Sequence, residues 1–195
     1  MGRAGREADG CPPYYYFLTL TLLAPLYIIF ISMETLKKSV YIETTIPSVI
    51  TARQSRDIGT LYRQTVTKDF WDNERHKYDL YVSEYVIEEC EKGDTDAAKR
   101  RLDLIKDIPS LPKSKDIDNL AEEYFKHLTI PDRAKTDCFH LAVCVMEKID
   151  FLLSWNLTHL GNDIFLKVYD FNQERGLKTP RLLDPDTFMS VMKLS

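Results

Sequence analysis

The chain has 195 residues, of which 44% are hydrophobic and 29% are charged, a composition typical of a folded domain and not of a disordered one. Its formal net charge of −4 argues against a protein that coats nucleic acid nonspecifically, because neutralising phosphates needs a basic surface. The four cysteines show neither Cys-x-x-Cys spacing nor histidine partners at zinc spacing, which disfavours a zinc site or a disulfide scaffold and fits reduced thiols in a cytoplasmic protein.

The first feature along the chain is an uncharged apolar run at residues 14–31, YYYFLTLTLLAPLYIIFI. It is nearly as long as the roughly 20 residues that a membrane-spanning helix needs. Three interpretations stay open: a membrane anchor, an uncleaved signal, and translated upstream sequence before a true start at Met33, which we favour slightly over an anchor. We therefore expect a separate segment over residues 1–32 and one domain over residues 33–195, with membrane attachment only if the first segment is translated.

Beyond that segment, short apolar runs alternate with helical patterns. The runs predict strands at residues 39–43, 78–83, 150–155 and 181–185. The helical patterns cover residues 56–77, 84–93, 94–105, 116–128 and 132–148, a stretch that follows residues 161–163 and ends at Gly176, and the C-terminus. Strands separated by helices predict a mostly parallel sheet covered on both faces, so the expected fold class is α/β, a three-layer α/β/α sandwich.

Polar residues fall where the predicted strands end. Glu43 ends the first strand, Ser83 and Glu84 end the second and begin its helix, and Asn156 follows the third. Asp137 lies in the helix before the third strand, with His140 one turn further on the same side. Open parallel sheets bind ligands beyond the carboxyl ends of their strands, so these groups are expected to converge.

Carboxylates held close together repel one another unless a cation or protons offset their charge. Mg²⁺ or Mn²⁺ prefers oxygen ligands and turns a bound water into a nucleophile, so these acids favour a Mg²⁺ or Mn²⁺ site. Each signal alone also has an ordinary structural explanation: a strand-end Glu as a helix cap, and His140 as a core residue with its hydrogen bonds satisfied. We expect Glu88 and Glu89 to face solvent, with the alternative that Glu88, one turn beyond Glu84, assists it.

Four stretches in this order resemble PIN-domain proteins, in particular the VapC-like group of toxin-type nucleases. They are VYIETTIPS (40–48), YVSEYVIEE (81–89), KTDCFHLAVC (135–144) and LLSWNLTHLGN (152–162). The resemblance implies an α/β/α sandwich around a parallel sheet, and an acidic Mg²⁺ or Mn²⁺ site that hydrolyses RNA phosphodiester bonds.

The resemblance also assigns positions. It places the catalytic and metal-binding residues at Glu43, Glu84, Asp137 and Asn156. It places Thr45 where a side chain helps to hold the first acid, and Ser83 and His140 are expected to support the ligands. Two departures stand out: Glu43 is one methylene longer than the usual Asp, and Asn156 is neutral where an Asp is common.

The leading prediction is a Mg²⁺- or Mn²⁺-dependent endoribonuclease of a toxin–antitoxin system, with RNA as substrate, a small antitoxin as partner, and a homodimer as its assembly. In this mechanism Glu43 and Asp137 hold the metal and Glu84 orients or deprotonates the attacking water. The alternative is a non-catalytic PIN-like module that binds RNA or a protein through a weakened acidic site, an interpretation favoured by Glu43 and Asn156.

Overall fold

The computed structural model describes residues 37–128, 130, 132–156 and 162–194. The predictions for the apolar run at 14–31 and for a domain boundary at residue 33 lie outside the described residues. The described residues belong to one compact unit that begins at Lys37. Within the described residues, no helix is long and apolar enough to span a bilayer.

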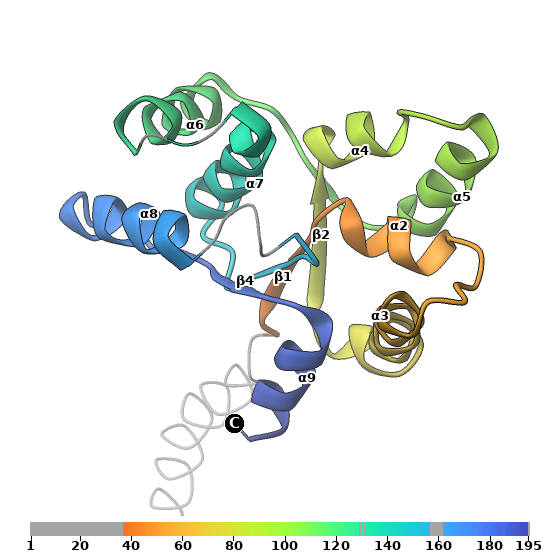
Figure 1. Ribbon diagram of the computed structural model, residues 1–195. Coiled ribbons are helices and arrows are strands. Elements are labelled where there is room, and N and C mark those ends of the chain that lie inside the picture. The colour runs from red at the N-terminus through yellow and green to blue at the C-terminus, as the bar shows by residue number, and fades with distance from the viewer. Residues whose placement is uncertain (1–36, 129, 131, 157–161, 195) are drawn as a thin grey trace, which may run out of the picture. The chain divides into compact units, whose positions relative to one another are not determined.

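A parallel sheet forms the middle of this unit (Figure 1). In the described part of the chain it has five strands in the order β3-β2-β1-β4-β5, and every pairing is parallel. The strands are β1 (Ser39–Ile42), β2 (Asp79–Ser83), β3 (Ser110–Leu111), β4 (Phe151–Leu153) and β5 (Arg181–Leu183). The central strand β1 carries Val40, Tyr41 and Ile42, all fully buried, because a parallel strand covered on both faces contacts water on neither.

Helices cover both faces of the sheet. They are α2 (Thr45–Thr51), α3 (Ile58–Asp69), α4 (Glu84–Cys90), α5 (Thr95–Ile105), α6 (Lys115–His127), α7 (Lys135–Met146), α8 (Asn162–Glu174) and α9 (Pro185–Lys193). Figure 1 shows α6, α7 and α8 on one side of the strands and α2, α3 and α5 on the other. The predicted α/β/α sandwich with a parallel sheet is therefore confirmed.

Local chemistry explains where several helices begin. The side chains of Ser83, Asp94, Ser114 and Asp184 each accept a hydrogen bond from a backbone N–H of the first turn that follows them. The helix expected over 56–77 is divided: α3 continues into a π-helical turn, η1 (Phe70–Glu74), and a 3₁₀ turn, η2 (Arg75–Lys77). A further 3₁₀ turn, η3 (Asp132–Ala134), precedes α7. Helix α2 and the two-residue strand β3 were not predicted.

The strand order positions the site. From β1 the chain continues to β2 on one side, and it later returns to add β4 on the other side of β1. Such a reversal leaves a crevice at the carboxyl ends of the two adjacent strands. The backbone N–H of Glu43, just past β1, donates to the carbonyl of Leu153 at the end of β4, with the N and O atoms 3.1 Å apart. The first expected acid therefore lies at the reversal point.

Candidate metal centre

Glu43 is held at the end of β1 with only 6% of its surface exposed. Its Oε2 atom accepts hydrogen bonds from the backbone N–H of Thr45 (2.9 Å), from the Thr45 hydroxyl, and from the Ser154 hydroxyl (2.9 Å). Within the described residues, every hydrogen bond to this side chain ends at Oε2. Three donors therefore fix the carboxylate and offset the cost of burying it, while Oε1 is left to a further ligand.

A second acid and a histidine lie beside Glu43. One ligand atom each from Glu43, Glu89 and His140 lies within 4.8 Å of the other two. Glu89, on α4, accepts hydrogen bonds from the Thr44 hydroxyl and from His140 Nε2, the latter at 2.9 Å. The group thus combines residues from the end of β1, from α4 and from α7.

The structure does not bring Glu84 into this group. Glu84 is exposed at the start of α4, and its Oε2 accepts a hydrogen bond from the backbone N–H of Lys113. The expectation that Glu89 faces solvent was wrong, because its side chain is only 23% exposed. The sequence contained a signal for this burial. Tyr85, Val86 and Cys90 form the buried face of α4, and Glu89 lies on the same face, four positions after Tyr85 and three after Val86.

A chain of buried hydrogen bonds holds His140 in place. The Tyr41 hydroxyl lies 2.8 Å from His140 Nδ1 and 2.6 Å from Ser83 Oγ. A carboxylate only accepts hydrogen bonds, so Nε2 donates to Glu89, and in the neutral ring Nδ1 accepts from Tyr41. When the ring is protonated, the two hydroxyls can rotate and the same contacts persist. In both states His140 is oriented on one side by Tyr41 and on the other by Glu89.

The surroundings shift two pKa values in opposite directions. Burial lowers the pKa of the His140 imidazole, but the hydrogen bond to Glu89 and the charges of Glu43, Glu89 and Asp137 outweigh it, so the pKa lies above its usual value. Burial raises the pKa of Glu89, but the hydrogen bond from His140, its charge and the Thr44 hydroxyl hold it below its usual value. Each partner thus stabilises the charged form of the other.

Asp137 and Asn156 form the other side of the site. Asp137 lies in the first turn of α7, is 7% exposed, and accepts a hydrogen bond from Asn156 Nδ2 at 3.1 Å. The backbone N–H of Asn156 donates to Ser154 Oγ (2.8 Å), and the same hydroxyl donates to Glu43. Asp137 is therefore connected to Glu43 through Asn156 and Ser154. Asn156 presents its amide nitrogen to this acid.

Glu43 and Glu89, but not Asp137, border a cleft of about 640 Å³ at the carboxyl edge of the sheet. Its lining includes Glu43, Glu89 and Asn156, together with two cations, Arg63 from α3 and Lys92 just after α4. Neither cation forms an ion pair within the described residues. The cleft therefore combines carboxylates with basic side chains that remain available to an anion.

The donor chemistry fits a hard divalent cation. Carboxylate oxygens are the ligands that Mg²⁺ and Mn²⁺ prefer, and the Glu43 and Glu89 oxygens are already within the reach of one ion. Both ring nitrogens of His140 are engaged in hydrogen bonds, which suits an orienting role better than coordination. Among the described residues, no cysteine belongs to this group, so the group does not resemble a structural zinc site.

The fold and the site define a class: a parallel α/β domain with an acidic group at its topological switch point. Two solved structures are similar to the chain. VapC20 of Mycobacterium tuberculosis, described as a toxin that cleaves the sarcin-ricin loop, is 14% identical, with a TM-score of 0.46 over 62% of this chain and 92% of its own. VapBC2 from Rickettsia felis, bound to a fragment of promoter DNA, is 12% identical, with a TM-score of 0.44 over 75% of this chain and 98% of its own. No protein-family model and no curated protein matches the chain.

Proposed function

We propose that the chain is a metal-dependent endoribonuclease of the toxin type, with Glu43, Glu89 and Asp137 as the residues that hold the cation. The observation that carries the proposal is the convergence of Glu43, Glu89 and His140 within 4.8 Å beside a cleft that also contains Arg63 and Lys92. Glu89 takes the place that the sequence resemblance had given to Glu84. The small antitoxin, the homodimer and a cytoplasmic location belong to the same proposal.

The chain's own residues prepare the reaction in three ways. Thr45 and Ser154 fix the Oε2 atom of Glu43, so the side chain loses little conformational entropy when its Oε1 atom binds a metal ion. His140, oriented by Tyr41, holds Glu89 as a carboxylate. Arg63 and Lys92 attract the phosphates of a substrate to the cleft. A bound Mg²⁺ or Mn²⁺ would supply a water nucleophile and stabilise the charge that develops on a phosphoryl oxygen.

The test compares two glutamates close together on the chain. The full chain should cut an end-labelled RNA with Mg²⁺ or Mn²⁺ and should stop in EDTA. Glu89→Gln should lose activity by about 10²–10³-fold, the usual cost of removing one electrostatic contact to the transition state. Glu91→Gln, at an exposed position, should keep activity within about twofold, the size expected away from the site. Equal cleavage by Glu89→Gln, or cleavage in EDTA, contradicts the proposal.

The alternative, a non-catalytic binding module, is favoured by one contact. The Asn156 amide already donates to Asp137 and so competes with a cation for that carboxylate. A thermal-shift titration with Mn²⁺ separates the two functions, since binding to the folded state alone raises the melting temperature. A nuclease should show a rise that Glu89→Gln abolishes. An inert module should show none and still retain RNA binding.

A further inference from the structure

The indole of Trp155 is held in a fixed position at the cleft. It lies two residues after the end of β4, lines the cleft together with Arg63, and is half-buried. The Trp155 backbone N–H donates to Thr45 Oγ1 at 2.8 Å, and its indole Nε1–H donates to Thr67 Oγ1, also at 2.8 Å. Thr67 in turn donates to the carbonyl of Arg63 at 2.6 Å. Both ends of the tryptophan are thus anchored, and the ring has one orientation.

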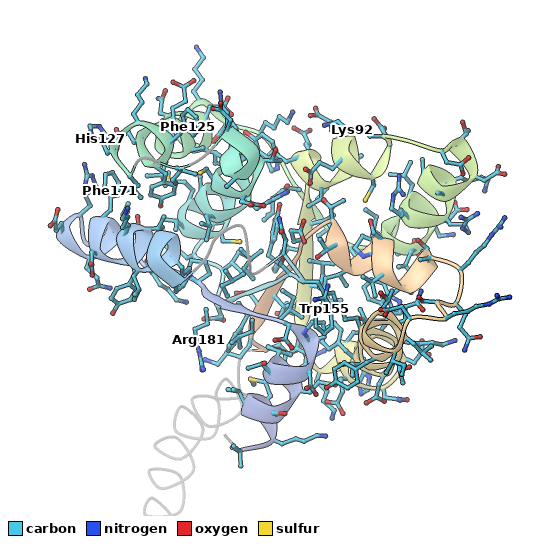
Figure 2. The ribbon with its side chains drawn as sticks, viewed as in Figure 1. Lys92, Phe125, His127, Trp155, Phe171 and Arg181 are labelled. Atoms are coloured by element: carbon cyan, nitrogen blue, oxygen red, sulfur yellow. The ribbon has the colours of Figure 1, made fainter. Side chains whose placement is uncertain are left out.

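One face of this ring already contacts a planar cation. The guanidinium carbon of Arg63 lies 5.3 Å from the centre of the Trp155 ring, within the range of a cation–π interaction. Trp155 and Arg63 both line the cleft, so this contact lies at the wall of the cleft. A nucleobase is planar and aromatic, so it can take the same place against the ring and leave the guanidinium to an adjacent phosphate. Figure 2 shows Trp155 near the strands and Lys92 by the end of α4.

The ring is also connected to the acidic group. The Thr45 hydroxyl that accepts from the Trp155 backbone donates to the Glu43 carboxylate. A base stacked on Trp155 therefore belongs to a nucleotide close to the phosphate that meets the acids. A paired base in an A-form helix exposes no face for stacking, whereas an unpaired base does.

We propose that Trp155 and Arg63 form a nucleobase site, which selects RNA that is single-stranded next to the cleaved bond. This inference rests on the proposed function for the identity of the substrate, and it adds the class of RNA and the residues that choose it. The competing explanation is that Trp155 only fills space between β4 and α3, since its ring also packs against the core.

Fluorescence gives a direct test, because the chain has two tryptophans and Trp71 is buried, with 5% of its surface exposed. In the full chain carrying Trp71→Phe, Trp155 is the one remaining tryptophan. The variant is titrated in EDTA with a single-stranded RNA of about 10 nucleotides, with the same backbone lacking bases, and with an RNA duplex of equal length. We expect saturable quenching by the first probe alone. Equal quenching by the abasic strand or by the duplex overturns the inference.

A second measurement guards against a Trp71→Phe variant that does not fold. Binding of fluorescein-labelled RNA to the full chain, to Trp155→Phe and to Trp155→Leu is followed by anisotropy, again in EDTA. Stacking of one base contributes about 1–3 kcal/mol, so Trp155→Leu should bind single-stranded RNA roughly 5- to 150-fold more weakly, while Trp155→Phe keeps most of the affinity. All three proteins should bind the abasic strand alike. A space-filling role instead predicts equal losses for both probes.

These outcomes are separate from those of the nuclease test. Base-dependent binding without metal-dependent cleavage rejects the nuclease and keeps the nucleobase site. The nucleobase site is rejected, and the nuclease is kept, if two results are found together. RNA with abasic sites next to the cleaved bond is cut as fast as intact RNA, and Trp155→Leu cuts RNA as fast as the unaltered chain.

Discussion

Tyr41→Phe tests whether the buried hydrogen-bond chain stabilises the site. The substitution removes one oxygen and leaves the ring, so it opens no large cavity around the fully buried Tyr41. That oxygen bonds both His140 Nδ1 and Ser83 Oγ, at 2.8 and 2.6 Å. Ser83 keeps a second partner, the backbone N–H of Val86, but Nδ1 keeps no other hydrogen bond within the described residues.

The expected cost follows from those contacts. A buried polar atom left unsatisfied costs about 1–3 kcal/mol, and the lost bond to Ser83 adds about 1 kcal/mol. We expect Tyr41→Phe to lower the free energy of unfolding by about 2–4 kcal/mol. In a chain of this size that corresponds to a fall in melting temperature of roughly 4–16 °C. Urea unfolding followed by circular dichroism measures the free energy, and a thermal scan measures the melting temperature.

Tyr81→Phe is the matched control. Tyr81 lies on the neighbouring strand β2, and its hydroxyl makes no hydrogen bond within the described part of the chain, so the change should stay within about 0.5 kcal/mol. If the two variants are equally stable, Tyr41 does not orient His140, and the argument that His140 positions Glu89 fails with it.

Two further substitutions test the structure away from the site. Burial raises the pKa of Asp150, but hydrogen bonds from Lys178 and Ser39 outweigh this effect and hold the pKa below its usual value. The stability that this carboxylate adds is therefore present above its unfolded pKa of about 3.9. It is lost as the pH falls through the lower pKa of the folded state. Asp150→Asn should therefore cost about 1–2 kcal/mol in urea unfolding at pH 7 and progressively less as the pH falls below the unfolded pKa; a cost that does not change with pH contradicts this assignment. Gly176→Ala should cost roughly 1–2 kcal/mol by the same assay, because φ is +67° while an added Cβ meets no atom within 4 Å; a neutral effect refutes the left-handed conformation.

The parts of the fold that the sequence predicted are those with a local, repeated signal. The apolar runs at β1, β2 and β4 and the helix carrying Asp137 and His140 lie where the patterns indicated. Helix α2 was not predicted because its seven residues, Pro47 among them, are too few to show a helical pattern, although Pro is tolerated in the first turn of a helix. Strand β3 has two residues, too few for any periodic pattern to indicate a strand.

The site was predicted less well, because strand ends specify an edge but not the direction of each side chain. Glu84 and Glu89 lie on one short helix, and only the buried face of that helix distinguishes them. The direction of the Asn156 amide depends on Asp137, a residue on another element, and no sequence pattern encodes such a pairing. Trp155 lay inside a recognised block, yet its contact with Arg63 brings together residues 92 positions apart.

The extra methylene of Glu43 has a consequence for evolution and for engineering. Its carboxylate turns back to the N–H of Thr45, the first residue of α2, so one side chain both begins a helix and faces the cleft. An aspartate at this position would still accept from the Thr45 N–H, as in an Asx turn, but its carboxylate would lie one methylene closer to the backbone. Exchange of the two acids, usually regarded as conservative, would here draw the carboxylate back from Ser154 and from the cleft while the turn persists.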